Sequence, residues 1–282
     1  MAKSRGIVGF VQRGFRSGGP VIPVVRLQGV IAADQRAGRL NIATLAPVLK
    51  RAFEMHGPAV ALIVNSPGGS PVQSRLIAKR IRDLADEHEK QVLVFVEDAA
   101  ASGGYFIASA GDEIIADPSS IVGSIGVIYA GFGFPQALAK LGIDRRVHTS
   151  GRNKSTMDPF LPVKPEDVAR ILQMESEIHQ VFIDYVKSRR AGKFKLADDE
   201  LFTGEFWSGV RGLELGLVDA LGDLHETLRT RFGEDVRTRV IEPRRGWFQL
   251  PRFGLSSLAQ QSVSADIAAA IEDRALWSRL GL

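Results

Sequence analysis

The fold is decided by one stretch of sequence, Asp98-Ala-Ala-Ala-Ser102-Gly103-Gly104-Tyr-Phe-Ile-Ala-Ser-Ala110. The apolar and β-branched run at residues 92–96 before it predicts a buried strand, and apolar side chains recur at helical spacing after it. We therefore expect Ser102 where a strand turns into a helix. The alanines and glycines around it remove side-chain bulk, so that a substrate or another backbone segment can come close.

Ser102 taken alone has two interpretations. A hydroxyl at this junction lies near the unpaired N–H groups and the positive end of a helix, which favours the development of negative charge. The alternative is a serine N-cap on a tightly packed helix, which is a common arrangement. The rest of the chain decides between the two.

Alternating strands and helices flank this stretch. We expect strands at 21–27, 60–64, 113–116, 143–148 and 238–241, and helices at 42–56, 72–89, 135–142, 166–190, 213–232 and 265–280. The first of these helices has Asn41 as its expected N-cap. The segment 121–134 is punctuated by glycines and is expected to be extended. Because the strands are nearly continuous in apolar residues, the pattern predicts an α/β fold with a mainly parallel, helix-covered sheet.

The chain has 282 residues, enough for one large domain with an appendage. Residues 1–19 are expected to form a flexible N-terminal arm, 20–243 the main domain, and 244–282 an amphipathic C-terminal extension that ends in a helix. Large apolar residues between Trp247 and Leu255 lie beside several arginines. This pattern predicts packing on a neighbouring subunit or a membrane surface, with a strap across the chain's own domain as the alternative.

Composition narrows the function classes. The chain has no cysteine, which excludes disulfides, thiolate metal sites and a cysteine nucleophile, and its histidines lack metal-ligand spacing, so we expect no metal and no cofactor. The net charge is +4, and the basic residues occur in scattered pairs rather than in one patch, so no nucleic-acid partner is expected. No apolar run approaches the roughly 18 to 20 residues of a membrane span, and no secretory leader is evident. We therefore expect a cytoplasmic protein, with peripheral contact to the inner face of the membrane left open.

Three further stretches could carry chemistry. In Asn65-Ser-Pro-Gly-Gly-Ser70, two glycines can present backbone N–H groups as an oxyanion hole, or they simply make a tight strand-to-helix turn. Ser124 in 119–127 is either a second hydroxyl beside a cleft or a side chain bonded to its own backbone. Lys154 in the polar loop 149–155 is either a surface lysine or the base that a serine nucleophile needs.

Together these stretches resemble the bacterial signal peptide peptidase A family, serine peptidases that use a Ser/Lys dyad on the ClpP/crotonase fold. The motifs occur in the family's order: Asn65-Ser-Pro-Gly-Gly69, Ala100-Ala-Ser-Gly-Gly-Tyr105, Gly123-Ser-Ile-Gly-Val127, and Ser150-Gly151 with Lys154. The resemblance covers residues 20–230 in the family's short, single-repeat form. Because no N-terminal membrane segment is expected from this sequence, it departs in that respect from the membrane-anchored members.

The resemblance implies a spiral of mainly parallel strands and a role for each motif. It implies Ser102 as the nucleophile, Lys154 as the general base and Ser124 as the hydroxyl that orients the lysine. It also implies an oxyanion hole from the N–H groups of Gly69 and Gly103, with Gly68, Ser70 and Val127 beside the substrate. The implied substrates are extended, largely apolar peptides such as remnant signal peptides. The implied assembly is a ring-like homo-oligomer whose dyad is shared between subunits.

Two other functions fit the same fold. A crotonase-type enzyme acting on acyl-CoA thioesters would share the glycine turn, but its chemistry needs carboxylates near the thioester, and only Asp98 is close to the Ser102 stretch. A catalytically inactive scaffold that binds peptides or membranes is the second alternative. The presence of both Ser102 and Lys154 speaks against the scaffold.

Overall fold

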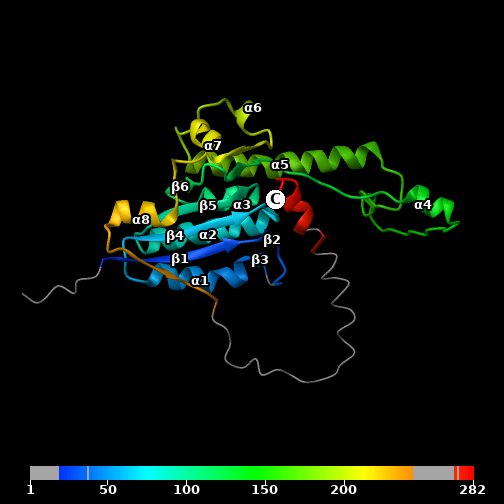
Figure 1. Ribbon diagram of the computed structural model, residues 1–282. Coiled ribbons are helices and arrows are strands. Elements are labelled where there is room, and N and C mark those ends of the chain that lie inside the picture. The colour runs from blue at the N-terminus through cyan, green and yellow to red at the C-terminus, as the bar shows by residue number, and fades with distance from the viewer. Residues whose placement is uncertain (1–18, 37, 244–269, 272) are drawn as a thin grey trace, which may run out of the picture.

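The structure is a computed structural model that describes residues 19–36, 38–243, 270–271 and 273–282. A mainly parallel sheet forms its centre, with strand order β10-β1-β4-β5-β6-β9 (Figure 1). These strands are β1 (Val21–Gln28), β4 (Ala59–Ser66), β5 (Gln91–Ala101), β6 (Glu113–Ala116), β9 (Ala220–Leu221) and β10 (Arg237–Val240). Every pairing along this path is parallel, so the predicted α/β class is confirmed.

Strand β5 carries two neighbours on one edge. Its first part pairs with β6, and residues 99–101 pair with β7 (Ile121–Gly123), which in turn pairs antiparallel with β8 (Phe206–Ser208). A separate ribbon is formed by β2 (Val30–Ile31) and β3 (Arg39–Leu40). The sheet therefore changes partners along β5 shortly before Ser102, which brings β7 beside this serine.

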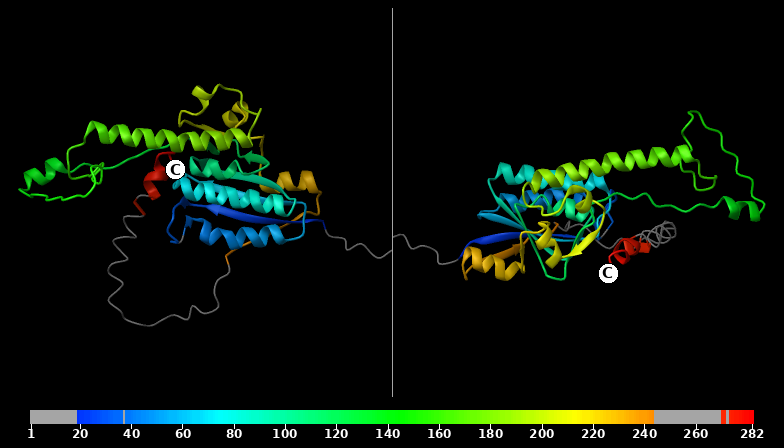
Figure 2. Two further views of the ribbon diagram at one scale, coloured as in Figure 1. Left: turned by 180° about the vertical axis from the view of Figure 1, so that it is seen from behind. Right: turned by 90° about the horizontal axis from the view of Figure 1, so that it is seen from above.

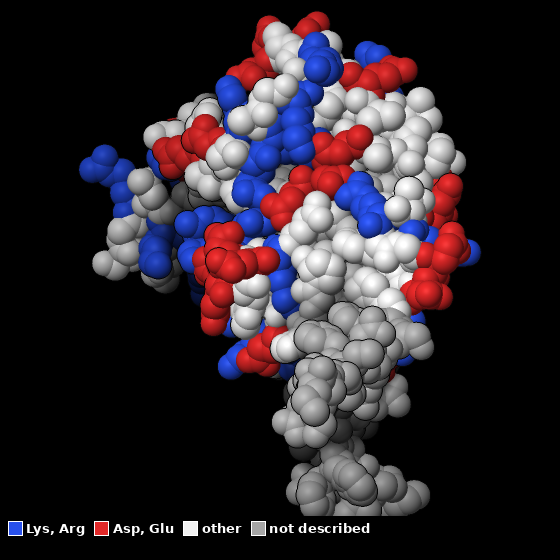
Figure 3. Space-filling view, turned by 90° about the vertical axis from the view of Figure 1, so that its left-hand side faces the viewer, with Lys and Arg blue, Asp and Glu red and all other residues white. Residues whose placement is uncertain are grey.

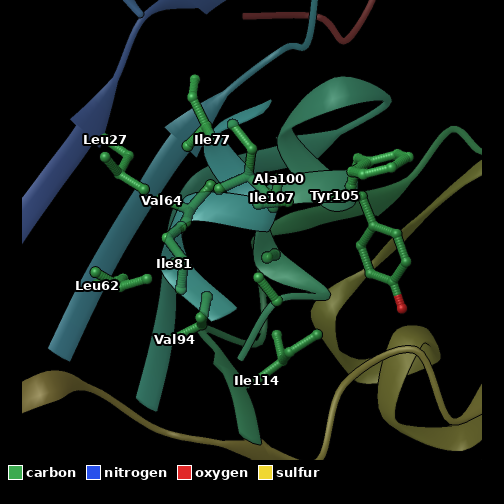
Figure 4. Close-up of a cluster of buried hydrophobic side chains, with 14 of the residues drawn as sticks. Leu27, Leu62, Val64, Ile77, Ile81, Val94, Ala100, Tyr105, Ile107 and Ile114 are labelled. Carbon is green, nitrogen blue, oxygen red and sulfur yellow. The ribbon is translucent and has the colours of Figure 1, made fainter. Parts of the chain in front are cut away.

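Helices cover both faces of the sheet. The larger core lies under α1 (Ile42–Glu54), α2 (Pro71–Glu87), α3 (Gly103–Ala108), α5 (Pro165–Arg189) and α7 (Gly209–Leu215). Figure 4 shows part of this core, where Ile77 and Ile81 of α2 pack between strand residues such as Leu62 and Val94. A smaller core on the opposite face packs α8 (Leu224–Phe232) through Leu228.

Asn41 caps α1 as predicted, because its side-chain oxygen accepts a hydrogen bond from the Thr44 N–H at 3.0 Å. Such a cap satisfies one of the donors that the first turn of a helix leaves unpaired. The start of α1 is therefore determined by local sequence.

A buried ion pair joins the end of α5 to the core. Arg190 is 1% exposed and donates to Asp219 at 2.8 Å and to the Gly216 carbonyl, and Lys193 also donates to Asp219. Burial alone would raise the pKa of Asp219, but the hydrogen bonds from Arg190 and Lys193 hold this pKa below its usual value. Nearby, the Tyr105 hydroxyl donates to the Leu217 carbonyl, and burial raises its pKa. These bonds tie α3, α5 and the 213–221 segment together.

Residues 128–164 form an arm that projects from the body together with the amino-terminal half of α5 (Figures 1 and 2). Its helix α4 (Pro135–Lys140) lies at the far end and has no buried residue. Large apolar side chains are exposed along the arm; Phe132, for example, is 82% exposed. Phe134 and Phe160 pack against each other, with Arg145 over the Phe160 ring. The arm is thus ordered locally without a core of its own.

Two predicted elements are wrong. Residues 143–148 were expected as a strand but are exposed and without regular structure, because in the arm no neighbouring strand is there to pair with them. The expected helix 213–232 is interrupted, because α7 ends at Gly216 in a left-handed conformation and residues 220–221 pair with β6. Asp223 then caps a new helix, α8. Strands β3 and β8 were also not predicted; β3 pairs with the nearby β2, whereas β8 pairs with β7, which lies far earlier in the chain.

The predicted final helix is helical at 270–271 and 273–278, while its start at 265–269 lies outside the described residues. Of the expected arm at 1–19, residues 1–18 also lie outside them, as does the apolar segment 247–255. Among the described helices, none has the length and hydropathy to cross a membrane. Figure 3 shows the face at the amino ends of the strands, where basic and acidic side chains are interspersed rather than gathered into a field of one sign.

Candidate active site

Ser102 lies at the predicted junction, directly after β5 and directly before α3. Its backbone has φ +52° and ψ −121°, a conformation that costs a non-glycine residue of order 1–3 kcal/mol. Residues 99–101 and 103–110 are buried, whereas Ser102 itself is half-buried and reaches solvent. A strained serine on a sharp strand-to-helix turn is the arrangement that presents a nucleophilic hydroxyl.

The Ser102 hydroxyl is not used to cap the helix. Ser102 occupies the N-cap position of α3, yet its side chain makes no capping hydrogen bond. The structure therefore contradicts the N-cap interpretation. Instead, its backbone N–H donates to the Gly123 carbonyl at 2.9 Å, which holds the residue in place through the main chain.

The glycine turn at residues 67–70 packs against Ser102. A Cβ on Gly68 would lie 2.8 Å from the Ser102 Cβ and 2.9 Å from the Gly103 nitrogen, and φ at Gly68 is +103°. Only glycine combines this close approach with this conformation without strain. The turn is held at its start by Asn65, whose side chain donates to Asp98 at 2.6 Å and accepts from the Ala99 N–H.

The N–H of Gly69 faces away from β2. Ile31 of β2 donates to the Gly68 carbonyl and accepts from the Ser70 N–H, both at 2.8 Å. Because these two groups face Ile31, the Gly69 N–H faces the other side, where it has no partner among the described residues. The Gly103 N–H is the first of α3 and also has no partner among them, as expected at a helix start. Two donors are thus available beside Ser102.

Ser124 comes beside Ser102 because of strand pairing. Strands β5 and β7 run parallel with Ala101 opposite Gly123, so each serine comes one residue after this pair. Ser124 is half-buried and has φ +53°, and its N–H donates to the Glu205 carbonyl at 2.6 Å. Ser102 and Ser124 are therefore both held by main-chain hydrogen bonds in backbone conformations that residues other than glycine rarely adopt.

Two hollows meet at Ser102, and both are also lined by Gly69, Gly126 and Val127. The first, called here the apolar pocket, has a volume of about 280 Å³. Its wall is formed by Phe106 of α3 and by Ile178, Val181 and Phe182 of α5. The second, called here the groove, has a volume of about 580 Å³ and continues past Ser124 toward Ile128 and Phe206. An extended chain passing Ser102 could place side chains in both.

The structure brings together most of the predicted site residues, with two exceptions. Ser102, Ser124, Gly69 and Val127 line the groove, Gly103 lines the apolar pocket, and Gly68 contacts Ser102. Ser70 is instead the N-cap of α2, where its hydroxyl accepts from the Gln73 N–H. Lys154 is exposed on the arm and lines neither hollow. Among the described residues of a single chain, no lysine therefore lines either hollow beside Ser102.

Several site residues were not foreseen from the sequence. The apolar stripe of α5 was predicted as a core face, but Ile178, Val181 and Phe182 also form the wall of the apolar pocket. Arg75 of α2 lies at the same pocket and has no ion-pair partner in the part of the chain that the structure describes. Helical periodicity shows which side of a helix is apolar, but it does not show which hollow that side borders.

Comparison with known proteins agrees with this geometry. Residues 85–235 match the sequence family described as Peptidase family S49. Over 73% of its length the chain is 36% identical to Protease 4 of Haemophilus influenzae, of which it covers 34%. In a solved structure of a mutant of the 1510-N membrane-bound stomatin-specific protease, 99% of that chain superposes on 80% of this one with a TM-score of 0.51 and 17% identity. That structural likeness concerns the fold.

A closer relative has a different name. The chain is 52% identical, over 96% of its length, to the Brucella abortus protein named Na(+)/H(+) antiporter NhaA, of which it covers 38%. The chain thus spans little more than a third of the length of these curated relatives. The name describes the whole Brucella protein, so it assigns no activity to the segment shared with this chain.

Proposed function

Because the chain belongs to peptidase family S49, we propose that it hydrolyses peptide bonds with Ser102 as the nucleophile and Lys154 as the general base. One observation carries the proposal: a strained, half-buried serine whose hydroxyl does not cap the helix lines an apolar pocket, beside two backbone N–H groups that have no partner among the described residues. A serine with a merely structural role would not need this combination of features.

In the proposed reaction, the Ser102 Oγ attacks the carbonyl carbon of the scissile bond while the Lys154 amine takes the hydroxyl proton. The N–H groups of Gly69 and Gly103 would stabilise the oxyanion, a contribution of about 3 kcal/mol for each lost donor. The lysine then returns the proton to the leaving amine, and water hydrolyses the acyl-enzyme. Ser124 would accept a hydrogen bond from the lysine and orient it.

Lys154 would come from a neighbouring copy of the chain. The lysine is exposed on an arm that projects from the body, whereas Ser102 is half-buried at the end of the sheet. Exposed apolar side chains along the same arm would be covered on assembly. A ring-like homo-oligomer would then complete each site across a subunit boundary and limit access to unfolded chains.

The proposed substrates are extended peptides with small or apolar residues, such as remnant signal peptides. The apolar pocket beside Ser102 has Phe106, Val181 and Phe182 in its wall, which suits an uncharged side chain. Among the described residues, no Asp or Glu lines either hollow. This composition favours a peptidase over an acyl-CoA enzyme, which needs carboxylates at the thioester.

Two experiments test the proposal. A fluorophosphonate probe should label the wild-type protein and fail to label Ser102→Ala, and absence of labelling in the wild-type protein would contradict the nucleophile. For the shared dyad, inactive Ser102→Ala and inactive Lys154→Ala subunits are mixed under conditions of subunit exchange. Activity should return, because some sites then pair an intact serine with an intact lysine. No recovery despite demonstrated mixing would place the dyad within one chain.

A further inference from the structure

Three of the last described residues, 273–282, line the groove. Leu276, Arg279 and Leu280 belong to its lining together with Ser102 and Ser124. Figure 1 shows this segment, in red, beside the end of the sheet where α3 begins. A part of the chain more than 170 residues from Ser102 in sequence thus borders the same hollow.

An ion pair anchors the segment to the machinery of the site. Asp273 accepts from Arg39 of β3 with an Nη2–Oδ1 distance of 2.8 Å, and the Arg39 side chain is only 9% exposed. Strand β3 pairs with β2, whose Ile31 holds the glycine turn by main-chain hydrogen bonds to Gly68 and Ser70. A bond to a nearly buried arginine stabilises position better than a surface pair does. The segment is therefore fixed to the ribbon that positions the glycine turn.

The segment borders the groove without filling it. Leu276 in the helical residues 273–278 and Leu280 in the turn that follows both line the groove and are partly buried. The groove keeps a volume of about 580 Å³, and Val127 and Phe206 line it together with these leucines. A hollow with apolar side chains and Ser102 in its lining accommodates a large side chain of an extended peptide.

Charge adds a second property to this wall. Arg279 is exposed, lines the groove, and has no ion-pair partner in the described ranges of the chain. No acidic side chain lines the groove among those residues. A cation at the edge of a partly enclosed cleft attracts negative charge on a bound chain, and the attraction weakens with salt.

We propose that Leu276, Arg279 and Leu280 form one wall of a substrate subsite on the Ser124 side of Ser102. Leu276 and Leu280 contact a large apolar side chain of the peptide, and Arg279 favours an acidic residue next to it. The proposal rests on the proposed peptidase function. It assigns this segment to substrate selection rather than to blocking the cleft.

The test compares Leu276→Ala/Leu280→Ala with Leu282→Ala, all in the full chain. Leu282 belongs to the same segment but lies at a different hollow, beside Trp277 and Asp98. Each enzyme is assayed on a peptide that the wild-type protein cleaves and on alanine replacements of it at each position. Where the parent peptide carries a large apolar residue at the position that this subsite binds, the double variant should cleave it with a kcat/KM about tenfold below that of the wild-type protein. For the peptide with alanine at that position the loss should vanish, and Leu282→Ala should match wild type throughout.

Arg279→Glu gives a second readout that does not depend on packing. At low salt it should reverse, by severalfold, the preference between peptides with Asp and with Lys beside the apolar residue. Reaction of Ser102 with a small fluorophosphonate needs no subsite, so every variant should be labelled at the wild-type rate. Unchanged peptide kinetics in both Leu276→Ala/Leu280→Ala and Arg279→Glu, or a gain of activity in either of them, would contradict the proposed subsite. Loss of labelling in the wild-type protein would instead overturn the peptidase proposal itself.

Discussion

The regions around Ser102 and Lys154 differ in nearly every physical property. Ser102 follows a buried strand and precedes a buried helix, and its backbone is held by hydrogen bonds to β7. Lys154 is exposed in an arm whose helix α4 has no buried residue. The first region is packed within one chain, whereas the arm has no core of its own among the described residues.

This difference indicates how each residue of the proposed dyad is held in a precise position. A nucleophile and its oxyanion donors must be positioned closely, and rigid packing in one core provides this. A base carried by an exposed arm would acquire its position only when the arm packs on another copy. The proposed chemistry is therefore coupled to assembly, because the isolated chain does not bring Lys154 to Ser102.

The largest expected effect removes either half of the dyad. Ser102→Ala and Lys154→Ala should each lower kcat/KM on a cleaved peptide by about 10³-fold or more, because attack and proton removal fail together. The double variant should be little worse than either single one. Additive losses in steady-state assays would show that the lysine is not the base for this serine.

The next effect concerns folding in the Ser102 region. Asp219→Asn should lower the free energy of unfolding by about 3 kcal/mol, because the buried Arg190 loses its charged partner. The folded-state pKa of Asp219 is lowered, so its contribution is present above about pH 4, near the unfolded value, and is lost as pH falls below that. Urea titrations between pH 7 and 3 should show a shallower acid loss in the variant. An unchanged acid dependence would exclude this ion pair as its source.

Equivalent glycine substitutions in the two regions should differ in effect. Gly68→Ala places a Cβ against Ser102 and Gly103 and should lower kcat/KM by about 100-fold through the oxyanion turn. Gly142→Ala in the arm also changes a residue with positive φ, but nothing lies within 4 Å of the added Cβ. Its peptidase activity should stay near wild type, with a local strain of about 1 kcal/mol. Equal losses in both variants would mean that the effect is conformational and not specific to the site.

The smallest expected effect on folding is in the arm. Phe132→Ala should change the free energy of unfolding of the isolated chain by less than about 0.5 kcal/mol, since the side chain is largely exposed. If the arm packs on a neighbouring copy, the same variant should weaken assembly, measured as the concentration dependence of mass by sedimentation. Strong destabilisation of the monomer would show that the arm folds back on its own domain.

Local patterns predicted the elements that pack within one stretch of chain. The Asn41 cap, the amphipathic helix α2 and the strand before Ser102 all follow from side-chain periodicity and capping, which act over a few residues. The prediction failed at residues 143–148 because a short segment with alternating apolar residues, Ile143 and Val147, forms a strand only beside a partner strand. It failed in 213–232 because pairing of 220–221 with β6 overrides helical propensity.

Local sequence patterns were sufficient to predict the α/β class, the strand-to-helix position of Ser102 and the glycine turn, because each depends on short-range sterics and hydrogen bonding. That Ser124 lies beside Ser102 follows instead from the tertiary structure, through the parallel pairing of β5 and β7. The tertiary structure also decided that α5 forms the wall of the apolar pocket and that Leu276 and Leu280 border the groove. The physical reason is that a hollow is formed by segments distant in sequence, and no local pattern records which segments meet.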